Sequence, residues 1–233
     1  MAVTKTVLTY FALLGMLGNS APILAADNAF SPAEQKVFLD DHMRSLKPSE
    51  MLQYSFKKTG SLEQAFEDKV LLSVKPSSDG KHKVVAVSYL SGDRKLNLPD
   101  DEDVQANPII KYFLEQDVRE MHRRTGGKEN YFRKRIRMAL AEAADVRPVA
   151  VTLNGKEVAA SQVRIQPYLN DPMRAKFSNF ENKAYVFTLC DQVPGSVYEL
   201  RTRVDDPSPA GKADQGQKLP LIEETLTFSR LDK

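Results

Sequence analysis

Three stretches in the first half of the chain carry apolar residues at every second position, and this spacing constrains the fold more than any other feature. The apolar positions are Leu52, Tyr54 and Phe56, then Val70, Leu72 and Val74, then Val85, Val87 and Tyr89. Successive side chains of a strand point to opposite faces of a sheet, so each stretch predicts a strand with one buried face. Turn residues at 76–80 separate the second stretch from the third, which predicts an antiparallel meander.

The same spacing returns in the second half of the chain. Asn154-Gly155 is the strongest short signal for a hairpin, and it stands between strand-like runs at 149–153 and 163–165. Further strands are expected at 185–190, 197–204 and 222–228, with turn residues 193–195 between the first two and a surface loop at 207–217. The chain therefore has two groups of strands.

A pair of helices is predicted between these two groups. Asn107 is suited to cap the first helix, with Pro108 in its first turn, and Gly126-Gly127 ends it. The second helix is expected from about residue 129, because apolar residues recur there at helical spacing. These residues are Phe132, Ile136, Leu140 and Ala143. A strand over 132–138 is the alternative, but the alanine-rich end of the segment favours the helix.

An N-terminal helix has a clear start signal. Ser31 is suited to the N-cap position, Pro32 to the first helical position, and Glu34 to a capping box with Ser31. The apolar stripe Leu39, Met43 and Leu46 continues the pattern, and Pro48 ends it. Together the elements predict an α+β fold: antiparallel strands in a β-sandwich or a partly open β-barrel, with this N-terminal helix and the central helical pair packed on it.

The first 26 residues have the pattern of a secretory signal peptide. Lys5 precedes an apolar run at 7–17, helix breakers follow, and Ala25 and Ala26 offer two alternative cleavage positions. The run is about half the roughly 20 residues that a membrane-spanning helix needs, which disfavours the alternative of an uncleaved anchor. We expect residues 1–26 to be removed and residues 27–233 to work as one domain in the periplasm or outside the cell, with no transmembrane anchor.

Cysteine content and charge limit the class of this exported domain. Cys190 is the only cysteine, so a core rather than disulfides must stabilise the fold, and no acyl group can be attached near the signal peptide. After removal of the first 26 residues, 32 basic and 31 acidic residues remain. This near balance argues against a general polyanion binder, and we expect no nucleic acid partner.

The search for motifs of enzymes and metal sites is mostly negative. The sequence contains no His-Glu-x-x-His, no Gly-x-Ser-x-Gly, no phosphate-binding glycine loop and no cysteine-based metal site. Adjacent residues Asp40, Asp41 and His42 would point in different directions on a helix, so we interpret them as an exposed helix end. The acidic run 100–103 lacks the spacing of a calcium loop and precedes a helix start, where negative charge is favourable. No cofactor is expected.

Basic residues are concentrated between positions 119 and 137, where the local net charge is +6. The candidate binding residues are Arg119, Arg123, Arg124, Lys128, Arg133 and Arg137, with Lys134 and Arg135 in the same segment. Guanidinium groups bind phosphates and carboxylates, so the candidate partners are an anionic envelope lipid, a glycan or another envelope protein. The alternative is structural, because cations complement a helix C-terminus and solvate a helix face.

Some segments in the middle of the chain resemble those of uncharacterised exported proteins of Gram-negative bacteria. These are Asn107-Pro108-Ile109-Ile110, Phe113-Leu114-Glu115, Gly126-Gly127 and Tyr131-Phe132-Arg133. The resemblance implies a periplasmic location and brings no catalytic residue.

Three functions are compatible with these patterns. The first is a non-enzymatic periplasmic protein that binds an envelope component or a partner protein through the arginine-rich helical region. The second is a hydrolase-type enzyme whose site is assembled from residues far apart in the sequence. The third is a carrier of an apolar ligand in a cavity of the sheet.

Overall fold

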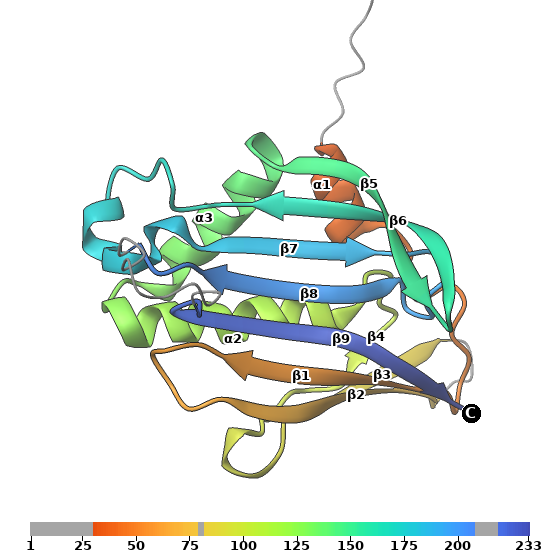
Figure 1. Cartoon of the computed structure of the whole chain (residues 1–233). Helices are drawn as coiled ribbons and strands as arrows, with labels where there is room; N and C mark the ends of the chain where they lie inside the picture. Colours follow the sequence, from red (N-terminus) through yellow and green to blue (C-terminus); the bar gives the residue numbers. More distant parts are fainter. Residues whose placement is uncertain (1–29, 79–81, 208–218) are drawn as a thin grey trace, which may run out of the picture.

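The computed structural model describes residues 30–78, 82–207 and 219–233 (Figure 1). The predicted signal peptide, residues 79 and 80 of the predicted turn and nearly all of the loop at 207–217 lie outside these residues. No helix within the described residues is both long and apolar enough to span a membrane.

One antiparallel sheet contains the nine described strands. They are β1 (Met51–Thr59), β2 (Phe66–Pro76), β3 (Lys83–Tyr89), β4 (Asp101–Glu102), β5 (Asp145–Leu153), β6 (Lys156–Ile165), β7 (Ala184–Leu189), β8 (Val197–Val204) and β9 (Ile222–Asp232). Their order across the sheet is β4-β3-β2-β1-β9-β8-β7-β6-β5. The last strand, β9, lies between β1 and β8 and so joins the N-terminal meander to the C-terminal one.

The strands predicted from alternation are confirmed, and their apolar positions face the core. Leu52, Tyr54 and Phe56 of β1 are fully buried, as are Val70 and Leu72 of β2. The hairpin at Asn154-Gly155 also forms, and both residues have the positive φ that this turn requires.

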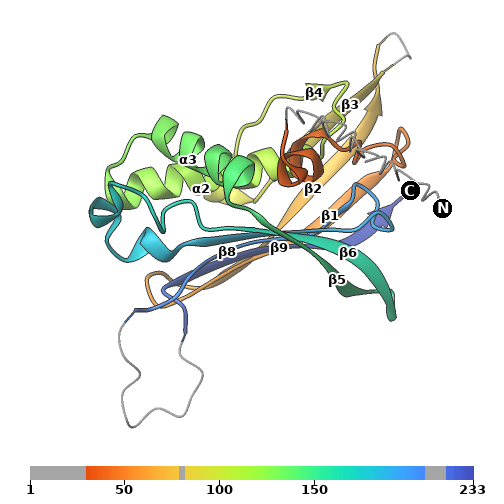
Figure 2. The same ribbon diagram turned by 90° about the horizontal axis from the view of Figure 1, so that it is seen from above.

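The α+β class is confirmed, with the helices on one face of a curved sheet (Figure 2). The two edge strands, β4 and β5, lie at opposite ends of the strand order and do not pair with each other. The sheet is therefore open, which is closer to the partly open barrel than to the sandwich; two facing sheets are not seen among the described strands.

The central helical pair is confirmed as α2 (Pro108–Thr125) and α3 (Glu129–Glu142). The Asn107 side chain accepts a hydrogen bond from the amide of Ile109 at 3.1 Å, and Gly126 ends α2 in the left-handed conformation. The alternative of a strand over 132–138 is wrong, because Phe132 and Ile136 pack on one face of α3.

The N-terminal helix is shorter than predicted. The capping box forms between Ser31 and Glu34, and α1 (Pro32–Glu34) continues into one π-helical turn, η1 (Gln35–Leu39). The chain then becomes extended at Asp40, so a helix reaching Pro48 was wrong. Met43 and Leu46 are still buried, which explains the apolar pattern without a helix. Two short 3₁₀ segments, η2 (Gly92–Arg94) and η3 (Arg174–Asn182), were not predicted.

Candidate ligand groove and buried charge networks

A cavity of about 730 Å³ lies between η1, residues 103–107, α2 and α3. Its apolar lining residues are Val37, Phe38, Val104, Ala106, Pro108, Ile110, Leu114, Val118 and Ile136. Its polar and charged lining residues are Asp103, Gln105, Asn107, Lys111, Glu115, Arg133 and Arg137. We call this cavity the helical groove. A mostly apolar cavity of this size with a few polar groups is typical of small-molecule sites.

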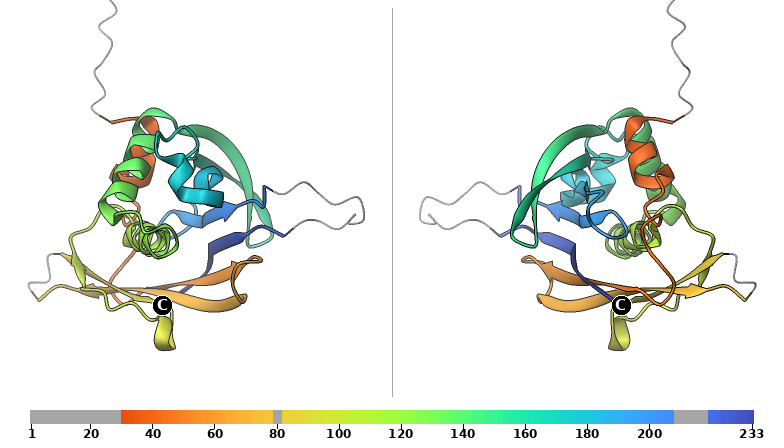
Figure 3. Two further views of the ribbon diagram at one scale, coloured as in Figure 1. Left: turned by 90° about the vertical axis from the view of Figure 1, so that its left-hand side faces the viewer. Right: turned by 90° about the vertical axis from the view of Figure 1, so that its right-hand side faces the viewer.

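The N-terminal segment forms one wall of the helical groove because it is held against α3. The Ser31 hydroxyl donates a hydrogen bond to the carbonyl of Leu140 at 2.9 Å. Both views of Figure 3 place this segment beside α3, on the side of the sheet where α2 lies. The π-helical turn that follows contributes Val37, which is fully buried, and the half-buried Phe38.

A second wall is fixed at the start of α2. The Asn107 side-chain amide donates hydrogen bonds to the Tyr54 hydroxyl at 3.2 Å and to the Gly195 carbonyl at 2.9 Å. The Asn107 backbone amide donates to Nδ1 of His42 at 3.1 Å, and Nε2 of His42 is 2.9 Å from the Lys36 carbonyl. Asn107 therefore ties the groove to strand β1, to the turn before β8 and to the segment after η1.

His42 is buried, so the prediction of an exposed helix end at Asp40-Asp41-His42 was wrong for the histidine. Its two hydrogen bonds require Nε2 to donate and Nδ1 to accept, which is the neutral form of the ring. Burial lowers the pKa of His42, and the nearby acids only partly oppose this. No group of three potential metal ligands occurs among the described residues.

The rim of the helical groove is basic on the side of α3. Arg133 forms ion pairs with Glu115 and Glu129, each at 2.7 Å, and its hydrogen bonds lower the pKa of Glu115. Lys111 pairs with Asp101 at 2.8 Å. Arg137 is exposed and has no ion pair with any residue that the structure describes.

The six predicted binding residues have different surroundings. Arg124 is largely buried, bonds Glu120 at 2.5 Å and lies over the ring of Phe180. Arg123 pairs with Glu120 at 2.9 Å. Arg119 and Lys128 are exposed, without an ion pair inside the described ranges. Only Arg133 and Arg137 reach the groove.

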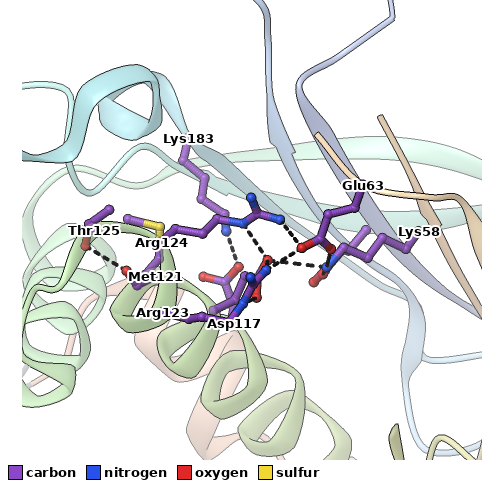
Figure 4. Close-up of polar contacts among 10 residues, drawn as sticks. Lys58, Glu63, Asp117, Met121, Arg123, Arg124, Thr125 and Lys183 are labelled. Carbon is purple, nitrogen blue, oxygen red and sulfur yellow. Dashed lines mark hydrogen bonds and ion pairs between the residues drawn. The ribbon is translucent and has the colours of Figure 1, made fainter. Parts of the chain in front are cut away.

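Lys58 lies at the centre of a buried charge network between α2 and the sheet (Figure 4). Its ammonium is 2.9 Å from Glu63, 3.0 Å from Glu224 and 3.4 Å from Glu120. Burial acts to lower the pKa of Lys58, but the carboxylates outweigh it and the pKa is raised. Burial also acts to raise the pKa of Glu120, yet hydrogen bonds from Arg123 and the charge of Lys58 hold it at about 2.

A second network joins α2 to β7. Lys183 and Asp117 form a fully buried ion pair, also drawn in Figure 4, and the Tyr185 hydroxyl donates to Asp117 at 2.5 Å. The Tyr168 and Tyr185 hydroxyls are 3.0 Å apart. These residues were missed in the sequence, where Asp117 and Lys183 stand 66 positions apart.

Both networks consist of charges that pair with one another inside the core. None of their side chains lines the helical groove. A general acid or base must reach its substrate, so this arrangement favours a structural role, in which charge pairs fasten α2 to the sheet.

No family model matches the chain, and no curated protein matches it in sequence. Structural likeness is low. Lipoprotein LppX of Mycobacterium tuberculosis is 10% identical, with a TM-score of 0.29, over 81% of this chain and 88% of that one. A LolA superfamily protein from Nitrosomonas europaea is 9% identical, with a TM-score of 0.23, over 85% and 90%.

A DUF1329 family protein from Desulfovibrio piger is 9% identical, with a TM-score of 0.23, over 78% of this chain and 84% of that chain. All three similar structures are from bacteria. At such scores the likeness carries no functional argument.

Proposed function

We propose that the protein is a non-enzymatic, exported binding protein that holds an apolar ligand in the helical groove. Residues 1–26 direct export, and residues 27–233 work as one domain in the periplasm. The observation that carries the proposal is the cavity of about 730 Å³ with its mostly apolar lining from η1, residues 103–107, α2 and α3. Burying an apolar ligand there removes its surface from water, at roughly 25 cal/mol per Å².

The groove replaces the cavity of the sheet that the carrier hypothesis expected. Large side chains fill the space between α2 and the sheet, among them Tyr54, Phe56 and Tyr89, all fully buried. The hydrolase alternative gains no support, because the converging charges are paired in the core and are separate from the groove.

The test is to block the helical groove with one substitution. Val104 lines the groove and is half-buried against the core, so we expect the indole ring of Val104→Trp to occupy the groove. Val151→Trp is the matched control, since Val151 is also half-buried but lies on edge strand β5. Mass spectrometry of extracts from gently isolated mature protein should find an apolar compound with the wild type and the control, and not with Val104→Trp. Empty extracts from all three would contradict the proposal.

A further inference from the structure

We infer that the ligand of the helical groove is an anionic amphiphile with one apolar chain, whose head group binds Arg137. The inference rests on the proposed function and specifies the ligand class. It starts from the position of Arg137 on α3, directly after Ile136, which is buried and lines the same groove. A cation and an apolar surface therefore adjoin at one point of the rim.

Arg137 differs from the other cations of the rim in having no counter-ion among the described residues. The guanidinium of Arg133 is occupied by Glu115 and Glu129, and its Nη1 also donates to Asn130 at 2.8 Å. Lys111 is held by Asp101. A ligand that reaches the rim thus meets one cation without a counter-ion among the described residues, and guanidinium donors bind carboxylate or phosphate oxygens in pairs.

The charged residues of the groove also determine the orientation of the bound ligand. Asp103 lines the wall formed by residues 103–107, whereas Arg137 lines the wall formed by α3. An anionic head group is attracted to α3 and repelled from Asp103, so its chain lies along the apolar lining between the two walls. The volume accommodates a ligand of drug-like size, such as one acyl chain with a small head group.

The experiment compares probes that share one chain length and differ only in the head group. Hexadecanoate, hexadecyl phosphate and uncharged hexadecanol are titrated into delipidated mature protein and followed by displacement of a fluorescent fatty probe. We expect at least one anion to bind about tenfold or more tightly than hexadecanol, as one charge-assisted hydrogen bond provides. The anion that binds more tightly then shows whether the head group of the ligand is a carboxylate or a phosphate.

Variants of α3 assign the effect to Arg137. Arg137→Ala should abolish the preference for anions, so that hexadecanoate and hexadecyl phosphate bind no more tightly than hexadecanol. Arg137→Lys should retain part of the preference. Lys134→Ala is the control, because Lys134 is also an exposed cation of α3 but does not line the groove. Circular dichroism checks that each variant is folded.

The outcomes separate the two proposals. Equal binding of all three probes, blocked by Val104→Trp, would overturn the role of Arg137 and leave the groove as an apolar site. A preference for anions that persists in Arg137→Ala would also overturn the role of Arg137. Failure of every probe to bind the wild-type protein would overturn the proposed function itself.

Discussion

The backbone amide of Asn107 donates a hydrogen bond to Nδ1 of His42, 65 positions earlier in the chain. The bond joins Asn107, which precedes α2 and lines the helical groove, to the segment after η1. Because Nδ1 accepts, the bond exists only while the imidazole is neutral.

This bond predicts a dependence of stability on pH. Burial lowers the pKa of His42 below 6.5 in the folded protein, so the unfolded chain takes up a proton first as the pH falls. The free energy of unfolding should therefore fall below a pH of about 6.5, down to the folded pKa of His42. Urea unfolding at a series of pH values measures this, and His42→Gln should reduce the pH dependence.

The charged groups around His42 are Asp40, Asp41, Asp191 and Lys36, and the acids partly stabilise its protonated form. His82→Gln serves as the control, because the side chain of His82 is exposed whereas His42 is buried. An unchanged slope in His42→Gln would contradict the assignment.

The surroundings of Gly195 predict that alanine destabilises the protein more at this position than at Gly155, although the two glycines have similar backbone conformations. Gly195 and Gly155 have φ angles of 76° and 75°. A Cβ at Gly195 would lie 2.7 Å from Leu52 and 2.9 Å from the Asn107 amide, whereas one at Gly155 meets nothing within 4 Å. Alanine costs about 1 kcal/mol at either site through backbone strain. Gly195→Ala should cost roughly 1–3 kcal/mol more, through overpacking.

Urea unfolding of both variants measures the difference, and equal losses would contradict the contact at Gly195. The same two variants also test the groove in a binding measurement, because movement of Asn107 changes the start of α2. Gly195→Ala should weaken binding of an apolar probe, and Gly155→Ala should not.

The sequence predicts those elements that are specified by residues close together in the chain. Alternation located the strands, and Asn107, Pro108 and Gly126 located α2, because these signals act over a few residues. The position of β9 between β1 and β8 could not be predicted from the sequence. It depends on the pairing of β9 with β1, and these two strands are about 170 residues apart in the chain. The early end of the first helix was missed because buried Met43 and Leu46 continued a helical spacing.

The candidate site was predicted only in part. Arg133 and Arg137 were singled out as surface cations, and they do lie on the groove rim, but Val37 and Phe38 were not recognised as its wall. Arg123 and Arg124 were assigned to the same patch, whereas the structure pairs them with Glu120. A run of basic residues in the sequence does not reveal which of them meet carboxylates from distant segments.

The buried pair of Lys183 and Asp117 predicts that substitutions at these two positions have strongly non-additive effects on the free energy of unfolding. Lys183→Met leaves the Asp117 carboxylate in the core without its cation, which should lower the free energy of unfolding by about 3–5 kcal/mol. Adding Asp117→Leu removes the unpaired charge, so the double variant should be more stable than Lys183→Met alone. Urea unfolding of the two single variants and the double variant measures the coupling.

The surface pair of Lys57 and Glu67 is the control for this cycle. Its two side chains are 3.1 Å apart and more than half exposed. Exposed pairs contribute about 0–1 kcal/mol, so Lys57→Met should change stability little, and adding Glu67→Leu should not restore any loss. If the buried pair behaved like the exposed one, α2 would not depend on Asp117 for its attachment to β7, and the charge networks would lose the structural role argued for them.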